Sequence, residues 1–219
     1  MSGDAGHIVV DAVIFDMDGT LLDSERVYRE VFLAAAAALG HDLAPRYDAF
    51  IGRSSADCRA LLAEWHPELD YEQVCADAHR LWKQRAPDDV VPVKDGVHAA
   101  LDRLDTLRLG RAVATSTPGA RARAKLAATG LLPRLAAVVG GDEVATPKPA
   151  PDIYLEAARR IGVDPRRCLA IEDSPTGFAA ARAAGCFTIL VPDLISPPED
   201  ALHVLDSLHL VAERLDALF

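Results

Sequence analysis

The sequence lacks paired cysteines, long apolar runs and an excess of basic side chains, and each absence excludes a class of protein. Its four cysteines are scattered with no Cys-x-x-Cys pair, so we expect reduced core thiols and no disulfide framework. The 23 basic and 33 acidic residues give a net charge of −10, which argues against nucleic acid or an anionic membrane as the main partner. No apolar run approaches the roughly 18 residues that a membrane span requires.

The amino-terminal residues, Met1 to His7, are polar and lack the charged-then-apolar pattern of a secretory signal. We therefore expect a cytoplasmic protein. A chain of 219 residues is long enough to bury a full core and to hold one domain with an insertion. We expect it to be a monomer.

Short apolar runs alternate with helical stretches, particularly after residue 92. Near-continuously apolar strands that alternate with helices predict a parallel sheet covered on both faces. The fold class we expect is α/β, with a doubly wound, Rossmann-like, mostly parallel sheet. The expected strands are Ala12–Phe15, Arg111–Thr115, Ala136–Val139, Cys168–Ile171 and Thr188–Val191, and the later helices lie near 95–107, 119–130, 150–162 and 175–185.

Residues 23–91 break this alternation, because the pattern there is helical almost throughout. We expect helices over Ser24–Leu39, Ser54–Trp65 and Tyr71–Arg85, with Ser24 as an N-cap. Three helices exceed the usual connection between a strand and the next helix, so a separate helical cap is favoured over helices that pack on the sheet. The predicted organisation is a core of residues 1–22 and 92–219 with a cap of residues 23–91.

Two acidic residues, Asp16 and Asp18, follow the first predicted strand in the pentad DMDGT. Neighbouring carboxylates at the end of a buried strand repel one another and desolvate poorly, so they need a metal, a basic partner or a raised pKa. Gly19 supplies the backbone freedom for a sharp exit from the strand. The alternative is a strand that ends in solvated aspartates, and the apolar run before the pair favours a site.

Polar residues follow three further predicted strands or their loops. These are Thr115-Ser116, Lys148 between two prolines, and Glu172-Asp173. Taken singly, each has an ordinary structural explanation: a helix cap, a solvated surface charge and the start of a helix. Because ligands bind at the carboxyl ends of the strands in such sheets, we expect all of them to belong to one site.

The order of these motifs resembles that of the haloacid dehalogenase-like hydrolases. The resemblance rests on DxDGT, the strand-end Thr-Ser, the pattern KPxPDxY at Lys148 and the string EDSPTGFAAARAAG that begins at Glu172. It covers essentially the whole chain, helical cap included. Within the family, the chain is most similar to the subgroup of β-phosphoglucomutase and phosphoglycolate phosphatase.

The resemblance implies roles for the core residues. Asp16 would attack phosphorus to give an aspartyl-phosphate, and Asp18 would protonate the leaving oxygen and then activate water. Thr115, Ser116 and Lys148 would bind the phosphoryl oxygens.

The resemblance also implies a metal site. Mg²⁺ prefers oxygen ligands and keeps several waters. Its expected ligands are Asp16, a backbone carbonyl of Asp18, and Asp173, with Glu172 as a direct or outer-sphere ligand.

The expected function is Mg²⁺-dependent hydrolysis of a small phosphomonoester, a sugar phosphate or similar metabolite. Gly52 and Arg53 lie in the cap loop that the family uses for substrate contact. A β-phosphoglucomutase-like mutase is the alternative, but the mutases carry a histidine where this chain has Tyr28 and a cap arginine where it has Ser55. Arg53, two positions away, keeps that alternative open.

Two other classes fit less well. Dehalogenases of the superfamily lack the second acidic residue of the first motif, so Asp18 argues against them. A non-catalytic binding protein would be expected to lose Asp16 or the metal acids, and the chain retains them. The histidines show no metal-ligand spacing, and the sequence assigns them no role.

Overall fold

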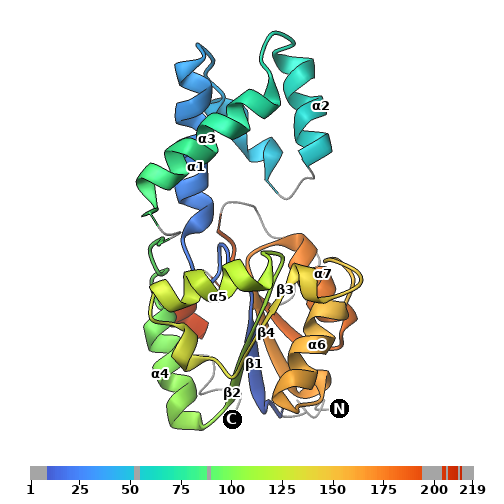
Figure 1. The fold of residues 1–219 in the computed structure, drawn as a ribbon. Coiled ribbons are helices and arrows are strands. Elements are labelled where there is room, and N and C mark those ends of the chain that lie inside the picture. The colour runs from blue at the N-terminus through green and yellow to red at the C-terminus, as the bar shows by residue number, and fades with distance from the viewer. Residues whose placement is uncertain are drawn as a thin grey trace, which may run out of the picture.

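Five parallel strands form the centre of the computed structural model, which describes residues 9–51, 55–87, 90–193, 204–205, 207–211 and 213 (Figure 1). The strand order is β3-β2-β1-β4-β5. The strands are β1 (Ala12–Phe15), β2 (Gly110–Thr115), β3 (Ala137–Gly140), β4 (Cys168–Glu172) and β5 (Phe187–Leu190). The chain proceeds to one side of β1 through β2 and to the other through β4, so β1 lies at the switch point of the sheet, where ligands bind in such folds.

Seven α-helices lie between these strands in the described residues, and residues 208–211 are helical as well. They are α1 (Ser24–Ala38), α2 (Ser55–Trp65), α3 (Tyr71–Arg85), α4 (Val97–Leu107), α5 (Gly119–Ala128), α6 (Asp152–Ile161) and α7 (Pro175–Ala183). Short 3₁₀ helices lie at η1 (Ala44–Phe50), η3 (Leu132–Arg134), η4 (Gly141–Glu143) and η5 (Pro165–Arg167). The doubly wound α/β class predicted from the sequence is confirmed, with each expected strand and helix within a few residues of its predicted bounds.

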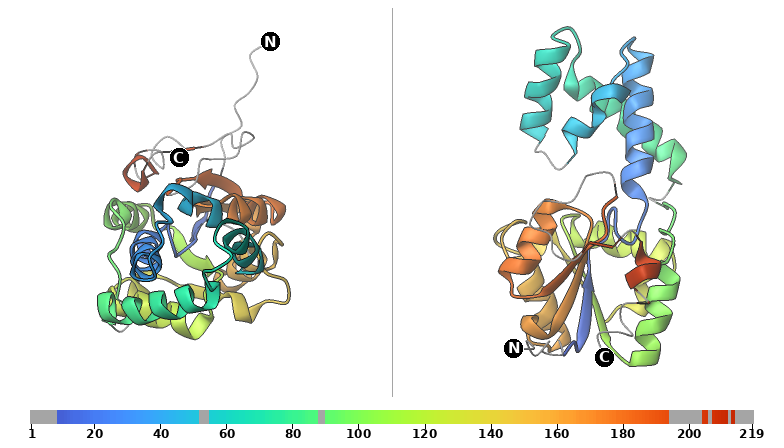
Figure 2. Two further views of the ribbon diagram at one scale, coloured as in Figure 1. Left: turned by 90° about the horizontal axis from the view of Figure 1, so that it is seen from above. Right: turned by 180° about the vertical axis from the view of Figure 1, so that it is seen from behind.

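Alternate residues of β1 face opposite layers of the core. Val13 and Phe15 belong to a buried cluster with side chains of α4 and α5, whereas Ala12 and Ile14 belong to a second cluster with side chains of α6 and α7. Figure 2 shows these helix pairs on the two faces of the sheet. The period of two along a strand thus produces both layers from one apolar run.

The helices α1, α2 and α3 lie together beyond one end of the sheet (Figures 1 and 2). They enclose an aromatic group centred on Phe32, whose ring lies 5.6 Å from that of Phe50 and 5.8 Å from that of Tyr47, measured between centroids. This helical segment corresponds to the predicted cap, but the division of the chain into core and cap at the predicted boundaries stays a prediction. Among the described residues, no helix combines the length and apolar character needed to cross a membrane.

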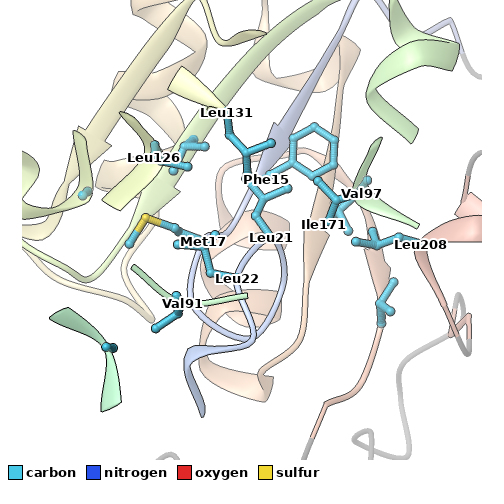
Figure 3. Packing of buried hydrophobic residues seen from close by; sticks show 14 of the residues in the cluster. Phe15, Met17, Leu21, Leu22, Val91, Val97, Leu126, Leu131, Ile171 and Leu208 are labelled. Carbon is cyan, nitrogen blue, oxygen red and sulfur yellow. The ribbon is translucent and has the colours of Figure 1, made fainter. Parts of the chain in front are cut away.

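Apolar packing is continuous below the helical segment. Figure 3 shows Met17, Leu21 and Leu22, from the turn after β1, beside Val91 and Leu126. All five are buried. The turn that carries the acidic pair is therefore anchored by its own apolar residues.

Two local expectations differ from the structure. The N-cap of α1 is Asp23, not Ser24, and its side chain makes no capping hydrogen bond. Ser24 is instead the first helical residue, and its hydroxyl donates to Asp18. The 3₁₀ helix η1 has no counterpart among the elements predicted from the sequence.

Two leucines in exposed and buried settings test the packing of the core. Leu104 of α4 is fully buried, whereas Leu155 of α6 is 43% exposed. We expect Leu104→Ala to lower the free energy of unfolding by about 2–5 kcal/mol. Leu155→Ala, the matched control, should change it by less than about 0.5 kcal/mol. Urea unfolding measures both, and equal effects would contradict the packing described here.

Candidate active site

A cavity of about 630 Å³ opens at the carboxyl end of the sheet and is roofed by the helical segment. Of the residues singled out in the sequence, its walls contain Asp16, Asp18, Thr115, Ser116, Lys148 and Asp173. Tyr28, Ile51, His79 and Trp82 line it from the helical segment. The structure thus brings together side chains from three strand ends and two loops, as the parallel topology predicts.

The ammonium group of Lys148 connects three strands at the floor of this site. It donates to Asp16 Oδ1 at 2.6 Å, to Glu172 Oε1 at 2.6 Å and to the backbone carbonyl of Ala114 at 3.0 Å. All three of its N–H groups are used in this way. Burial alone would lower the pKa of Lys148, but the charges of Asp16 and Glu172 raise it above its ordinary value.

Glu172 is fully buried and has a donor on each carboxylate oxygen. Tyr154 donates its hydroxyl to Oε1 at 2.5 Å, and Ser174 donates to Oε2 at 3.1 Å. Gly177 closes the space above it, because a Cβ at that position would lie 1.9 Å from Oε1. Ser174 also caps α7, accepting from the Gly177 N–H, as the sequence indicates.

Asp16, Glu172 and Asp173 form an acidic group whose oxygens lie within 4.8 Å of one another. Burial raises the pKa of Asp16, and the charge of Lys148 offsets this only in part. Burial and the charges of Asp16 and Glu172 raise the pKa of Asp173 well above its ordinary value. Raised values mean that the folded protein disfavours these negative charges, so the group fits a hard divalent cation.

Gly19 shapes the same group. Its backbone has φ +86°, and a Cβ there would lie 2.1 Å from Asp173 Oδ2. The glycine therefore permits both the turn and the close approach of the Asp173 carboxylate to the DMDGT loop.

Asp18 has a different environment from Asp16, although one residue separates them. Its Oδ1 accepts from Ser24 at 2.7 Å and from Lys125 at 2.8 Å, and its Oδ2 accepts from Thr117 at 2.6 Å. Burial would raise the pKa of Asp18, but the charge of Lys125 together with the hydrogen bonds from Lys125, Thr117 and Ser24 lowers it. Asp18 is therefore held ionised and fixed in orientation.

Lys125 of α5 is a site residue that the sequence does not indicate. Its side chain is 5% exposed, and its ammonium lies 5.6 Å from the centroid of the Trp82 ring on α3. A lysine in a helix rich in alanine and arginine gives no signal of its position. The sequence also does not indicate Thr117 and Ser24, because the DMDGT motif does not show which residues donate hydrogen bonds to Asp18.

The loop after β2 presents hydroxyl groups to the cavity. Thr115 is buried, and its hydroxyl oxygen accepts from the backbone N–H of Thr117 at 3.1 Å. Ser116, beside it, is exposed in the cavity wall. Gly52 and Arg53, the predicted cap-loop contacts, lie outside the described residues, while the preceding Ile51 lines the cavity.

Comparison with known proteins connects this geometry with a family. A model of the haloacid dehalogenase-like hydrolases matches residues 10–185. The chain belongs to this family. The haloacid dehalogenase-like resemblance predicted from the motifs is therefore confirmed, and so is the class of hydrolase.

Relatives within the haloacid dehalogenase-like family match along most of their length. The chain is 36% identical to protein CbbY of Rhodobacter capsulatus, covering 86% of this chain and 88% of that protein. It is 36% identical to fructose-1-phosphate phosphatase YqaB of Escherichia coli strain K12, covering 79% and 92% respectively. A solved structure of a putative β-phosphoglucomutase from Thermotoga maritima is similar with a TM-score of 0.78 and 28% identity, covering 96% of this chain and all of that one. The family match and the phosphatase among these relatives bear out the predicted enzyme class, a phosphoric monoester hydrolase.

Replacement of Lys148 tests the charge balance of the site. We expect Lys148→Met to lower the free energy of unfolding by about 3–5 kcal/mol, because Asp16 and Glu172 lose their shared buried cation. Urea unfolding at neutral pH with a chelator present measures this. Lys83→Met, an exposed lysine of α3, is the control and should be nearly neutral. Equal unfolding midpoints for the two variants would show that the buried pairing contributes nothing.

Proposed function

We propose that the chain is a Mg²⁺-dependent phosphatase that hydrolyses small sugar phosphates through an aspartyl-phosphate at Asp16. One observation carries the proposal: Asp16 and Asp18 follow the same strand, but Asp16 is paired with the buried Lys148 whereas Asp18 accepts from Lys125, Ser24 and Thr117. Two neighbouring carboxyl groups with different partners are typical of a site that divides nucleophilic and acid–base roles. Both face the same cavity.

In the first step, a carboxylate oxygen of Asp16 attacks phosphorus, and the bond from phosphorus to the substrate oxygen breaks. The leaving alkoxide takes a proton from the Asp18 carboxyl group, which would be protonated in the substrate complex because the negative phosphoryl group beside it raises the pKa of Asp18 above that in the free site. Lys148, fixed by its contacts to Asp16 and Ala114, would stabilise the negative charge on the phosphoryl oxygens. The hydroxyl groups of Thr115 and Ser116 would hold the phosphoryl group in position.

In the second step, the Asp18 carboxylate takes a proton from water, and the water oxygen attacks phosphorus of the acyl phosphate. The bond between phosphorus and the Asp16 oxygen breaks, which releases inorganic phosphate and restores both side chains. The hydrogen bonds from Ser24, Lys125 and Thr117 would hold Asp18 in its ionised form for this step. The same carboxyl group thus acts first as acid and then as base.

The acidic group of Asp16, Glu172 and Asp173 would hold Mg²⁺, with the backbone carbonyl of Asp18 as a further oxygen ligand. When bound, the ion supplies positive charge for the phosphoryl oxygens and offsets the carboxylate charges. Glu172 is the least suited to direct ligation, because both of its oxygens already accept hydrogen bonds. We assign it the outer-sphere role.

Sugar phosphates are the substrate class that the cavity and the relatives support best. Glu25, His79 and Trp82 all line the cavity. The two polar side chains suit the hydroxyl groups of a sugar, and the Trp82 ring suits its carbon skeleton. A relative covering 79% of the chain is named as a fructose-1-phosphate phosphatase. We further propose that residues 23–91 act as the cap that selects the substrate, and that the protein works as a cytoplasmic monomer.

A panel of phosphomonoesters assayed with and without Mg²⁺ tests the proposed function. The panel contains fructose 1-phosphate, β-glucose 1-phosphate, phosphoglycolate, a nucleotide and p-nitrophenyl phosphate. We expect phosphate release that requires Mg²⁺ and is fastest with a sugar phosphate. Asp16→Asn should lower the rate by at least about 1,000-fold, because it removes the nucleophile, while circular dichroism shows an unchanged fold.

Three outcomes would contradict the proposal. Retained activity in Asp16→Asn would exclude this residue as nucleophile. Conversion of β-glucose 1-phosphate into glucose 6-phosphate, in place of phosphate release, would favour the mutase. No phosphate release from any compound with Mg²⁺ present would favour a non-catalytic binding protein.

A burst experiment separates the roles of the two aspartates. With p-nitrophenyl phosphate, Asp18→Asn should release one p-nitrophenolate per chain and then nearly stop. This leaving group needs no proton, whereas hydrolysis of the aspartyl-phosphate needs the base, whose loss costs about 100- to 10,000-fold. Stopped-flow absorbance measures the burst, and Asp16→Asn should show none. Steady turnover by Asp18→Asn without a burst would remove its role as base.

A further inference from the structure

A second group of metal-type side chains lies in the helical segment, away from the cavity. His41 follows α1, His66 follows α2, and Glu68 lies in the turn that leads to α3. One potential ligand atom from each lies within 4.8 Å of the other two. Figure 1 shows that α1 and α2 both end on the side of the helical segment that faces away from the sheet. None of the three residues lines the described cavity.

The distances in this group suit a small cation better than direct hydrogen bonds. Nδ1 of His41 and Nδ1 of His66 each lie 3.5 Å from the same oxygen, Oε1 of Glu68. An ordinary hydrogen bond between nitrogen and oxygen spans about 2.7–3.2 Å. Tetrahedral zinc, with ligands at about 2.0–2.2 Å, separates neighbouring ligand atoms by about 3.3–3.6 Å. The two histidine-to-glutamate distances thus match two edges of such a tetrahedron.

The backbone holds the three residues in place. The N–H of His41 donates to Ala36 of α1 at 3.0 Å, and the N–H of His66 donates to Leu62 of α2 at 2.7 Å. The carbonyl of His66 accepts from the Leu69 N–H at 2.9 Å, which closes the turn that carries Glu68. The backbone of the group therefore needs little ordering to bind an ion.

The electrostatic setting also favours a cation. Both histidines stand just beyond helix carboxyl ends, where the helix dipole is negative. A hydrogen bond from its own backbone N–H, together with the nearby histidines, lowers the pKa of Glu68, so its carboxylate is ionised. The histidine side chains are 18% and 28% exposed and that of Glu68 is 60% exposed, which leaves a path for an ion and for a water ligand.

We propose that His41, His66 and Glu68 form a Zn²⁺ site that links the end of α1 to the turn between α2 and α3. Two imidazoles and one carboxylate, with water in the fourth position, are a ligand set typical of zinc. Mg²⁺ prefers oxygen ligands, so it suits the all-carboxylate group at the sheet better than these two histidines and one glutamate. The two groups therefore select different ions. The sequence gives no indication of this site, because 24 positions separate His41 from the pair His66 and Glu68.

Equilibrium dialysis against Zn²⁺ with excess Mg²⁺ tests the site, since Mg²⁺ competes for the carboxylate group at the sheet. We expect one Zn²⁺ per chain, measured by elemental analysis, and a melting temperature that rises with Zn²⁺ concentration. His41→Gln and His66→Gln should each weaken Zn²⁺ affinity by at least about 100-fold, more than the loss of an outer-sphere partner would cause. Glu68→Gln, at an exposed position that tolerates replacement, should weaken it as well and lose the Zn²⁺-dependent rise in melting temperature.

Two controls make the result specific. His98→Gln removes an exposed histidine of α4, and Asp173→Asn removes an acid of the sheet group; both should bind Zn²⁺ as the native chain does. Co²⁺ absorption in the visible range reports tetrahedral nitrogen and oxygen ligands directly. Unchanged Zn²⁺ binding in His41→Gln and Glu68→Gln, its loss in Asp173→Asn, or no binding by the native chain would each overturn the proposal.

Discussion

The site depends on one buried cation, the ammonium group of Lys148. Its three donors reach Asp16 after β1, the Ala114 carbonyl in β2 and Glu172 at the end of β4. A buried carboxylate is costly without a paired charge, and Lys148 supplies that charge to both Asp16 and Glu172. Backbone pairing fixes the positions of the three strand ends. Because Lys148 contacts all three, this pairing also determines where the reacting groups lie.

A second lysine gives the two aspartates different chemistry. Lys148 shares its charge between two carboxylates, whereas Lys125 pairs with Asp18. Because Lys148 is shared, its positive charge offsets only part of the cost of ionising Asp16, and the negative charges near Asp16 increase that cost. Asp18, by contrast, has its own cation and two hydroxyl donors. Because Lys125 also lies against Trp82 of α3, the environment of Asp18 includes a side chain from the helical segment.

The sequence predicts those parts of the site that local patterns encode. The apolar runs locate the strands, and parallel topology brings Asp16, Thr115 and Glu172 to one edge. It does not reveal Lys125, because a helix position has no visible relation to a strand end more than a hundred residues away. Nor does it reveal the grouping of His41 with His66, which depends on how two helices pack. The cap loop at Gly52 and Arg53 lies outside the described residues, so its predicted contacts stay predictions.

The absence of a side chain is as decisive here as any charge. The Gly19 backbone touches the carboxylate of Asp173, and that of Gly177 touches the carboxylate of Glu172, both at distances that leave no room for a methyl group. Backbone atoms therefore limit the position of each acid on one side. One added carbon atom at either glycine would displace an acid without changing any charge in the molecule. The geometry of the acidic residues thus depends on two glycine positions that carry no functional group.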